Sequence, residues 1–524
     1  MKPTPRWILL LVLSLPILAA CGQPEPVPPG AFDVLARWVP AGEDQAFFLD
    51  FKPEGQSGRH WQRIRDRIEA NLEGQQALAT ILGEFRIEEY GLQDAMDGPA
   101  VSVYSDGTHH TIAQVSDGAA AQEALYQHFE GVDWEQVEFE GVTLYQARIL
   151  DHGGQIAWLA WTVHDGLLFL IQSYGHYRQA MPRLQELLSL PEGDSLAALP
   201  AWGTLRGRLP QSPMGLIFLR VGEPTRSDAP SPPAIVGEQM EAVAAAAVPE
   251  ADGMRVEVAG TFQAGGDVPP ELQALYDLPA VDPADWAGLP ANSALSLVAH
   301  NASMVWPWLV DILSIDLKGL DDLRDTIGLD LEADLFGAAG PLGGDFALSI
   351  TPPLPGQPIA EGLTAAQLLF LTPDATPTQA DDVRIAMEGR GATFASGEVE
   401  GIDIQSQLGT ALSGYALSYG FDDGEFYFAS SPEIIGQAVV AQREGTGLVE
   451  TEAFQRVLKA LPDESILVAY LQIGLLIDLV RANSTDEEYQ VQGEILALEA
   501  FEAIGVGLRF QPGYLDGVFY FLVP

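Results

Sequence analysis

Residues 415–433 of this chain are YALSYGFDDGEFYFASSPE. Aromatic and apolar residues lie on both sides of Asp422-Asp423-Gly424, and an Asp-Gly pair supplies the positive φ angles of a tight β-hairpin turn. In Ser431-Pro432-Glu433, serine suits a helix cap, proline the first turn and glutamate the positive end of the helix dipole. The stretch therefore predicts a hairpin that is followed directly by a helix.

A matching pattern occurs earlier in the chain. Residues 155–163, Asp165-Gly166 and 167–171 predict a second hairpin, with Ser173 at the start of the helix that follows. Seven pairs of short segments recur in the same order at offsets of 250 to 264 residues, which indicates an internal duplication. The pairs are Val39-Pro40-Ala41 and Leu289-Pro290-Ala291, Phe129-Glu130-Gly131 and Met387-Glu388-Gly389, Asp165-Gly166 and Asp423-Gly424, Ser173 and Ser431, Gln179-Ala180 and Gln437-Ala438, Leu209-Pro210 and Leu461-Pro462, and Asp252-Gly253 and Asp516-Gly517.

The predicted fold class is α+β, because hairpin-spaced strands alternate with helices in each half. We expect two tandem related domains of antiparallel β-hairpins with interspersed helices, at residues 33–265 and 287–524. A proline-rich linker at residues 266–286 is predicted to join them.

The N-terminus has the pattern of a bacterial lipoprotein signal. Basic Lys2 and Arg6 come before an apolar run, and Leu18-Ala19-Ala20-Cys21 follows it. This order predicts a signal peptide at residues 1–20, cleavage after Ala20 and lipidation of Cys21, with a Pro/Gly tether at residues 21–32. We therefore expect an extracytoplasmic protein that is lipid-anchored to a bacterial membrane.

The composition limits the thiol chemistry open to the protein and the charge of its partners. Cys21 is the only cysteine, so lipidation would leave no thiol for a disulfide, a metal or a redox step. With 26 Lys+Arg and 73 Asp+Glu residues, the formal net charge is −47. Such a surface repels nucleic acid and anionic headgroups, and it favours cations or a basic partner. Solubility is the simpler explanation of this charge.

No catalytic, cofactor-binding or metal-binding residue is assigned from the sequence. It lacks a Gly-x-Ser-x-Gly elbow, a His-Glu-x-x-His pair, a phosphate loop and a Gly-x-Gly-x-x-Gly fingerprint. The acidic stretch 321–334 fails as a calcium loop, because Thr326 replaces the required glycine and Leu323 a ligand. Six histidines lie between residues 109 and 176, and we interpret them as surface or structural groups: His109, His110, His128, His152, His164 and His176.

Tryptophans at two places could form a carbohydrate or peptide platform. They are Trp158 with Trp161, and Trp306-Pro307-Trp308. Aromatic residues at strand and helix spacing are more often core residues, and we interpret these as core.

Several segments of the second half resemble a known family. They are Leu289-Pro290-Ala291 with the strand at 295–298, the run from Ile327 to Leu335, and the strand entry from Gly343 to Phe346. These are similar to bacterial extracytoplasmic proteins of domain-of-unknown-function family 3352, most clearly over residues 287–475 and more faintly over 37–220. The resemblance implies no activity and assigns no functional residue.

The sequence favours a non-catalytic envelope binding or scaffolding role, with an unknown protein or apolar ligand as the partner. One alternative is a carrier of lipid or another apolar ligand, since the strands are rich in Phe, Tyr and Leu; a tightly filled sheet interior would count against it. A second alternative is a hydrolase with a scattered acid/base site, which a solid core beneath the histidines would oppose.

Overall fold

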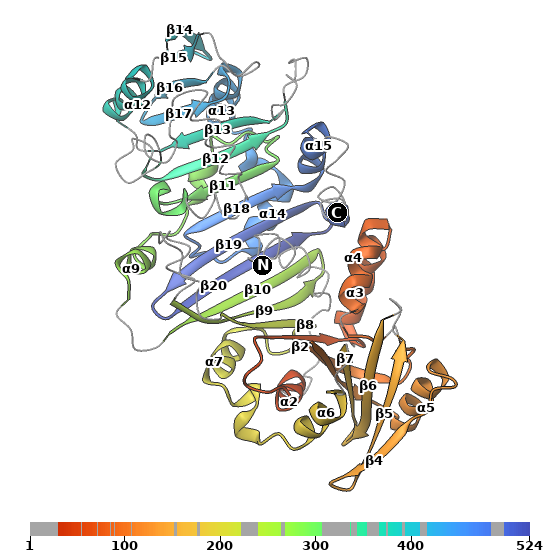
Figure 1. Ribbon diagram of the computed structural model, residues 1–524. Helices are drawn as coiled ribbons and strands as arrows, with labels where there is room; N and C mark the ends of the chain where they lie inside the picture. The colour runs from red at the N-terminus through yellow and green to blue at the C-terminus, as the bar shows by residue number, and fades with distance from the viewer. Residues whose placement is uncertain are drawn as a thin grey trace. The chain divides into compact units, whose positions relative to one another are not determined.

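The fold was analysed in a computed structural model, which describes most of the chain (Figure 1). The described residues are 30–524 except 54, 71, 84, 88–89, 106, 151–154, 175–178, 222–238, 264–267, 307–335, 337–342, 354–365, 374–375, 390–392, 409–416 and 484–496. The predicted signal peptide, Ala20, Cys21, most of the tether and most of the acidic stretch 321–334 lie outside them.

The prediction of an α+β fold based on antiparallel sheet is confirmed. The described residues contain 20 strands, and the ladders within each of the two units are antiparallel. The chain folds into two compact units. The N-terminal unit lies within Ser14–Pro224 and Met240–Ala264, and the C-terminal unit within Gly265–Pro524.

The N-terminal unit contains ten strands in the sheet order β4-β5-β6-β7-β3-β2-β1-β8-β9-β10. The strands are β1 (Gln45–Asp50), β2 (Met96–Ser105), β3 (Thr108–Val115), β4 (Glu135–Phe139), β5 (Val142–Leu150), β6 (Ile156–His164), β7 (Leu167–Tyr174), β8 (Gly215–Arg220), β9 (Met240–Glu250) and β10 (Gly253–Phe262). Its helices are α2 (Ala31–Ala36), α3 (Gly55–Ile68), α4 (Leu72–Gly83), α5 (Gly118–His128), α6 (Ala180–Leu188) and α7 (Pro200–Arg208), with the 3-10 turns η1 (Glu192–Asp194) and η2 (Leu196–Ala198).

The C-terminal unit contains ten strands in the sheet order β14-β15-β16-β17-β13-β12-β11-β18-β19-β20. The strands are β11 (Leu295–Ala299), β12 (Phe346–Thr351), β13 (Gln367–Thr372), β14 (Phe394–Val399), β15 (Ile402–Gln407), β16 (Ser418–Asp422), β17 (Glu425–Ala429), β18 (Leu467–Gln472), β19 (Ala503–Gln511) and β20 (Tyr514–Leu522). Its helices are α9 (Pro270–Tyr276), α12 (Pro377–Gly389), α13 (Pro432–Glu444), α14 (Glu452–Ala460) and α15 (Ile473–Asn483), with the 3-10 turns η3 (Pro283–Trp286), η5 (Leu448–Glu450) and η6 (Ala497–Ala500).

The N-terminal sheet is packed on both faces. Helices α2, α6 and α7 cover one face, where Phe48, Phe169 and Phe218 are each at most 1% exposed (Figure 1). Strand residues alternate between faces, so Trp161 points away from that core. It joins an aromatic cluster beneath α5, stacking on Tyr145 with ring centroids 4.2 Å apart. Both faces of the sheet thus carry buried aromatic side chains.

The C-terminal sheet is packed in the same two-sided way. Leu369 of β13 belongs to the core beneath α13 and α14, whereas the adjacent Phe370 belongs to a core on the opposite face. Trp286 of η3 is fully buried in the first of these cores. The C-terminal end of the predicted linker is therefore part of this unit's core.

Both predicted Asp-Gly hairpins are present. Asp165 and Gly166 have φ angles of 51° and 76°, and Asp423 and Gly424 have 46° and 90°. Positive φ at both central residues is the geometry of a type I′ turn, whose twist matches that of the strands. These turns set the register of β6–β7 and β16–β17.

Of the two predicted helix starts, the one at Ser431 is confirmed and the one at Ser173 is wrong. Ser173 lies inside β7, where it pairs with Trp158, because that strand continues to Tyr174. Ser431 does occupy the N-cap of α13, with Pro432 as the first helical residue, but its side chain makes no cap hydrogen bond. The two serines still hold the same place, since each is the seventh residue after the turn glycine.

One predicted landmark pair is wrong. Asp252 lies in the turn between β9 and β10, whereas Asp516 and Gly517 lie inside β20. The turn between β19 and β20 is instead Pro512-Gly513, where Gly513 has a φ of 85°. The two Asp-Gly pairs therefore occupy different positions in their hairpins.

Candidate functional site

The histidine-rich stretch places two side chains inside the N-terminal sheet. His109 and His110 of β3 are 3% and 2% exposed, and as neighbours in a strand they point to opposite faces. His109 Nε2 lies 2.9 Å from Ser102 Oγ on β2. Both imidazoles are almost fully buried among the strands, which counts against an open catalytic cleft around them.

His110 belongs to a polar group that we call the Arg183 cluster: Glu43, His110, Arg183 and Glu186. The first three are largely buried, whereas the Glu186 side chain is 58% exposed. Arg183 of α6 donates from Nε to His110 Nε2 at 3.4 Å, and its terminal nitrogens pair with Glu43 and with Glu186. Burial, with Arg183 and then His109, lowers the pKa of His110 to about 3. His110 is therefore neutral at ordinary pH and accepts a hydrogen bond from a permanently charged guanidinium.

The Arg183 cluster fastens α6 to the sheet. Arg183 joins this helix to β3 and also to the segment before β1, through the 7%-exposed Glu43. A hydrolase would need a carboxylate that orients or shares a proton with the histidine. Here the guanidinium lies between the two groups, so the geometry suits structural pairing.

The other described histidines of that stretch lie apart from the cluster. His164 Nε2 lies 3.5 Å from Asp165 Oδ2 at the hairpin turn, and His128 packs edge-on against Phe129. His152 and His176 lie outside the described residues. Within the described ranges, no three His, Cys, Asp or Glu side chains are placed to hold a metal ion.

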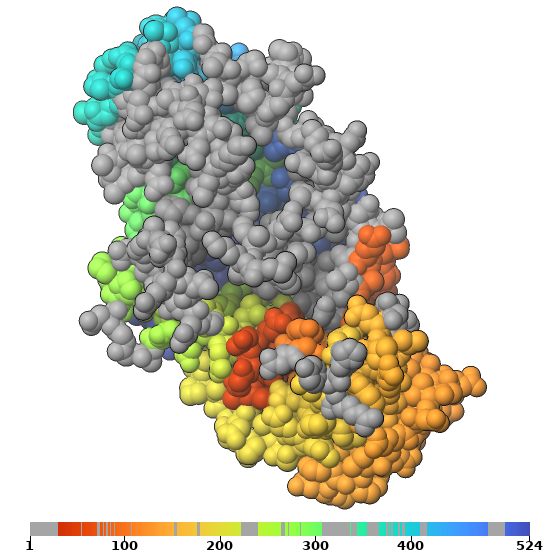
Figure 2. Space-filling view, viewed as in Figure 1, coloured from red at the N-terminus to blue at the C-terminus, as the bar shows by residue number. Residues whose placement is uncertain are grey.

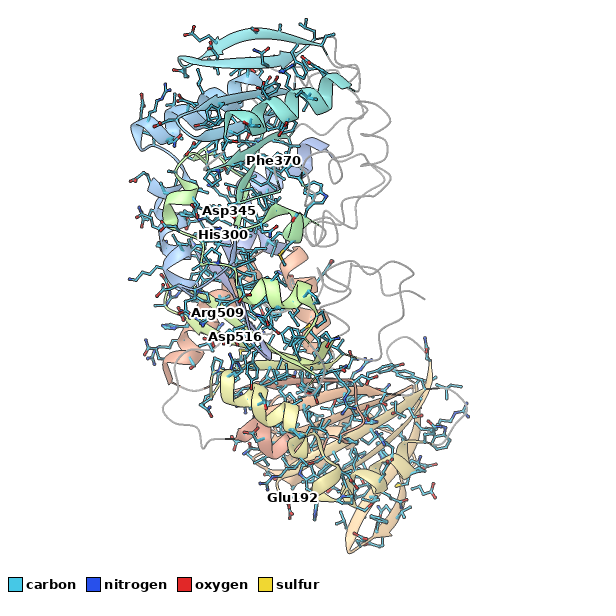
Figure 3. All side chains as sticks on the ribbon, turned by 90° about the vertical axis from the view of Figure 1, so that its left-hand side faces the viewer. Glu192, His300, Asp345, Phe370, Arg509 and Asp516 are labelled. Atoms are coloured by element: carbon cyan, nitrogen blue, oxygen red, sulfur yellow. The ribbon has the colours of Figure 1, made fainter. Side chains whose placement is uncertain are left out.

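A second titratable group lies in the C-terminal unit, and the sequence reasoning missed it. His300, directly after β11, has its Nδ1 2.9 Å from Asp345 Oδ2 and its Nε2 3.1 Å from the carbonyl oxygen of Ala280 (Figure 3). Burial alone would lower the pKa of His300, but the interactions with Asp345, Ala280 and Asp285 outweigh it and raise the pKa. Burial also raises the pKa of Asp285.

The Asp345 contact identifies His300 as a protonation-dependent link. Both ring nitrogens face oxygen acceptors, so only the imidazolium can donate a proton to each. Ala280 lies between α9 and η3, which means that the ring ties this connection to the start of β12. The sequence signal was weak, because a lone histidine and a distant aspartate show no spacing.

The predicted aromatic core is confirmed where it is described. Trp161 is 1% exposed beneath Tyr126, Trp134 and Tyr145. Trp306 stacks on Phe336 with ring centroids 4.6 Å apart. A shallow hollow runs along the outer side of α5, beside this cluster, and is lined by Ala119, Gln122, Glu123, Tyr126, Gln127 and Glu130. Trp308 lies outside the described residues.

The edge of the N-terminal sheet is exposed and acidic. Among the described residues, β4 pairs with β5 alone, and Glu135, Gln136 and Glu138 are exposed. Val137 and Phe139 lie on the face opposite Gln136 and Glu138 and pack against the core. This end of the unit is coloured orange in the space-filling view (Figure 2).

β14 holds the corresponding place in the C-terminal unit. It pairs with β15 alone in the described part of the chain, and its hairpin turns at Glu400-Gly401 as that of β4 turns at Glu140-Gly141. Both glutamates have positive φ, at 50° for Glu140 and 49° for Glu400. The sequence reasoning overlooked these Glu-Gly turns.

Comparisons with known proteins identify a family and little beyond it. A family model described as "Protein of unknown function (DUF3352)" matches residues 110–507. Two solved structures, crystal forms IV and III of TP0453, are similar at a TM-score of 0.25 and 11% identity, which is too low to support an inference. They cover 44% and 49% of this chain and 83% and 89% of theirs. No curated protein matches the chain.

None of the helices in the described ranges is both long and apolar enough to cross a membrane.

Proposed function

This chain belongs to the DUF3352 family of proteins of unknown function, and we propose that it is a lipid-anchored extracytoplasmic protein with a non-catalytic binding or scaffolding role. The Leu18-Ala19-Ala20-Cys21 segment supports the anchor. The tether after it would keep the first unit close to the bilayer, since an extended chain spans at most about 3.5 Å per residue.

The binding role is supported by a difference between two kinds of polar group. Those in the interior are paired within their own unit, whereas those of the edge strand β4 are exposed. The Arg183 cluster and the His300–Asp345 pair are engaged within their own units. The exposed backbone and carboxylates of β4 face outward. Such an edge offers a surface for recognition, because an unpaired strand is a template for another chain.

We further propose that the two units are copies of one domain. Counted from its first strand, each unit has the same strand order, which supports this. A specific hydrogen bond also recurs: Leu196 N donates to Val39 O at 2.7 Å, and Leu448 N donates to Leu289 O at 2.8 Å. Both bonds join the start of a 3-10 turn to a member of the Val39–Leu289 landmark pair.

The carrier alternative receives less support from the packing. Phe48, Phe169 and Phe218 fill one core, and Trp286, Tyr470 and Tyr520 fill another, all at 2% exposure or less. A ligand inside these two cores would have to displace close-packed side chains, which is costly. The burial of His109 and His110 weighs against a hydrolase centred there, since neither ring is accessible to a substrate.

The anchor is tested by Cys21→Ala in the full-length chain. Wild-type protein should fractionate with membranes and yield an acylated N-terminal peptide by mass spectrometry. The variant should lose the acyl groups and leave the membrane fraction. An unmodified cysteine in membrane-bound wild-type protein would contradict the proposal. Crosslinking in intact cells, followed by identification of captured neighbours, tests the binding role separately.

A further inference from the structure

The geometry points to the outer edge of β4 as a docking site for an extended protein segment in which basic and apolar residues alternate. This inference rests on the proposed binding role and gives it a surface and a partner chemistry. The occupant would add a strand beside β4, using backbone hydrogen bonds for affinity and alternate side chains for specificity.

The backbone groups available on this edge can be assigned from the turn. Phe139 and Val142 flank the two-residue Glu140-Gly141 turn, so they exchange both ladder hydrogen bonds. Bonded and non-bonded pairs alternate along an antiparallel ladder. Gln136 and Glu138 therefore direct their N–H and C=O groups outward, away from β5.

The side chains define what the added strand must carry. On one face, Val137 and Phe139 are half-buried against the core, so an apolar side chain beside them would extend that core. On the other face lie the exposed Gln136 and Glu138. A basic residue there would meet the Glu138 carboxylate, which already accepts a hydrogen bond from Thr143 at 2.7 Å.

The negative charge around β4 favours a positively charged partner. The segment Phe129–Ala147 contains Glu130, Asp133, Glu135, Glu138 and Glu140 and no Lys, Arg or His. Two copies of this edge repel each other, which guards against edge-to-edge aggregation. The same charge attracts a basic segment of another protein, so the edge discriminates between partners by sign.

The equivalent edge strand of the C-terminal unit, β14, is less suited to bind such a segment than β4. Counting back from the Glu-Gly turns places Glu398 at the position of Glu138 and Gly397 at the position of Val137. Glycine provides no side chain for an apolar partner to cover. β14 therefore serves as a matched control within the same chain.

The test uses the full-length chain in detergent and a peptide of about ten residues in which valine and lysine alternate, long enough to span a typical strand. Binding is measured by calorimetry against a peptide in which glutamate replaces lysine. The proposal expects binding of the basic peptide alone. It is overturned if the basic peptide does not bind, or if the acidic one binds equally well.

Two substitutions locate the site. Gln136→Pro removes an outward N–H while sparing the ladder to β5, and should weaken binding by about tenfold. Glu138→Lys should weaken it by a similar factor and reduce its salt dependence, because the other four carboxylates of the segment remain. The matched controls Ser396→Pro and Glu398→Lys should leave binding within about twofold. Thermal unfolding confirms that each variant is folded.

The outcomes separate this inference from the wider proposal. If Gln136→Pro and Ser396→Pro both leave binding unchanged, the peptide is held by diffuse negative charge and the β4 site is wrong. Membrane fractionation of the Cys21→Ala variant and crosslinked neighbours remain independent readouts of the anchored binding role. Loss of peptide binding on Gln136→Pro alone supports strand addition at β4.

Discussion

The Nδ1 atom of His300 lies 2.9 Å from the Oδ2 atom of Asp345, and its Nε2 atom lies 3.1 Å from the carbonyl oxygen of Ala280. The raised pKa of His300 means that the folded protein holds this proton more tightly than the unfolded chain does. The resulting stabilisation is fully present below the unfolded pKa of about 6.5, and it is lost as the pH rises through the higher folded value.

We therefore expect His300→Gln to destabilise the protein at pH 6 and to have less effect at pH 9. The difference should be about 0.5 kcal/mol, because the Asp345 side chain is half-exposed and solvent screens the pair. Thermal unfolding of both proteins at the two pH values provides the measurement. An effect that is equal at both values would show that protonation of His300 does not contribute.

His110 should behave in the opposite sense. Its folded pKa is lowered to about 3, so the stability that depends on neutral His110 is present above pH 6.5 and is lost as the pH falls toward 3. His110→Leu removes this titration. Between pH 6.5 and pH 4, the variant should lose less unfolding free energy than wild type. The difference between the two losses should be on the order of 2 kcal/mol. Parallel curves for the two proteins would refute the assignment.

Arg183→Met tests the Arg183 cluster directly. Glu43 is 7% exposed, and loss of Arg183 would remove the guanidinium that compensates the charge of this buried carboxylate. We expect a loss of about 3 kcal/mol in unfolding free energy, measured by urea denaturation. Adding Glu43→Gln should recover part of this loss, because it removes the buried charge. A double variant no more stable than Arg183→Met would locate the cost elsewhere.

Gly505 allows a prediction about packing in the C-terminal unit. A Cβ atom at this position of β19 would collide with Val457 Cγ1 on α14. Gly505→Ala should therefore cost about 2 kcal/mol through overpacking. Gly474→Ala in α15 is the control, since nothing lies within 4 Å of its added Cβ and alanine favours the helix. Equal effects of the two substitutions would contradict the close approach.

Local chemistry explains what the sequence could predict. Asp165-Gly166 and Asp423-Gly424 identify their turns because few residue pairs tolerate positive φ at both positions. The predicted helix start at Ser173 is wrong because the length of β7 depends on pairing with β3 and β6, which no local signal encodes. Glu140 shows that a glutamate can also occupy such a turn when glycine follows it.

The candidate sites depend on contacts between distant segments, which limited their prediction. Asp345 reaches His300 only because Ala299 pairs with Phe346 in the β11–β12 ladder. The acidic alternation of β4 is visible in the sequence, but its position at a sheet edge follows from the strand order. Arg183 gave no signal, since an arginine on a short helix is ordinarily exposed.

His110 and Leu369 occupy corresponding ladder positions in their two sheets. His110 pairs with Ile171, the fifth residue after Gly166, and Leu369 pairs with Ala429, the fifth residue after Gly424. One arrangement of strands thus accommodates either a histidine bonded to a guanidinium or a plain aliphatic side chain at the same interior place. A few interior substitutions can consequently make the stability of one unit depend on pH. The other unit, with a leucine at that position, has no titrating group there.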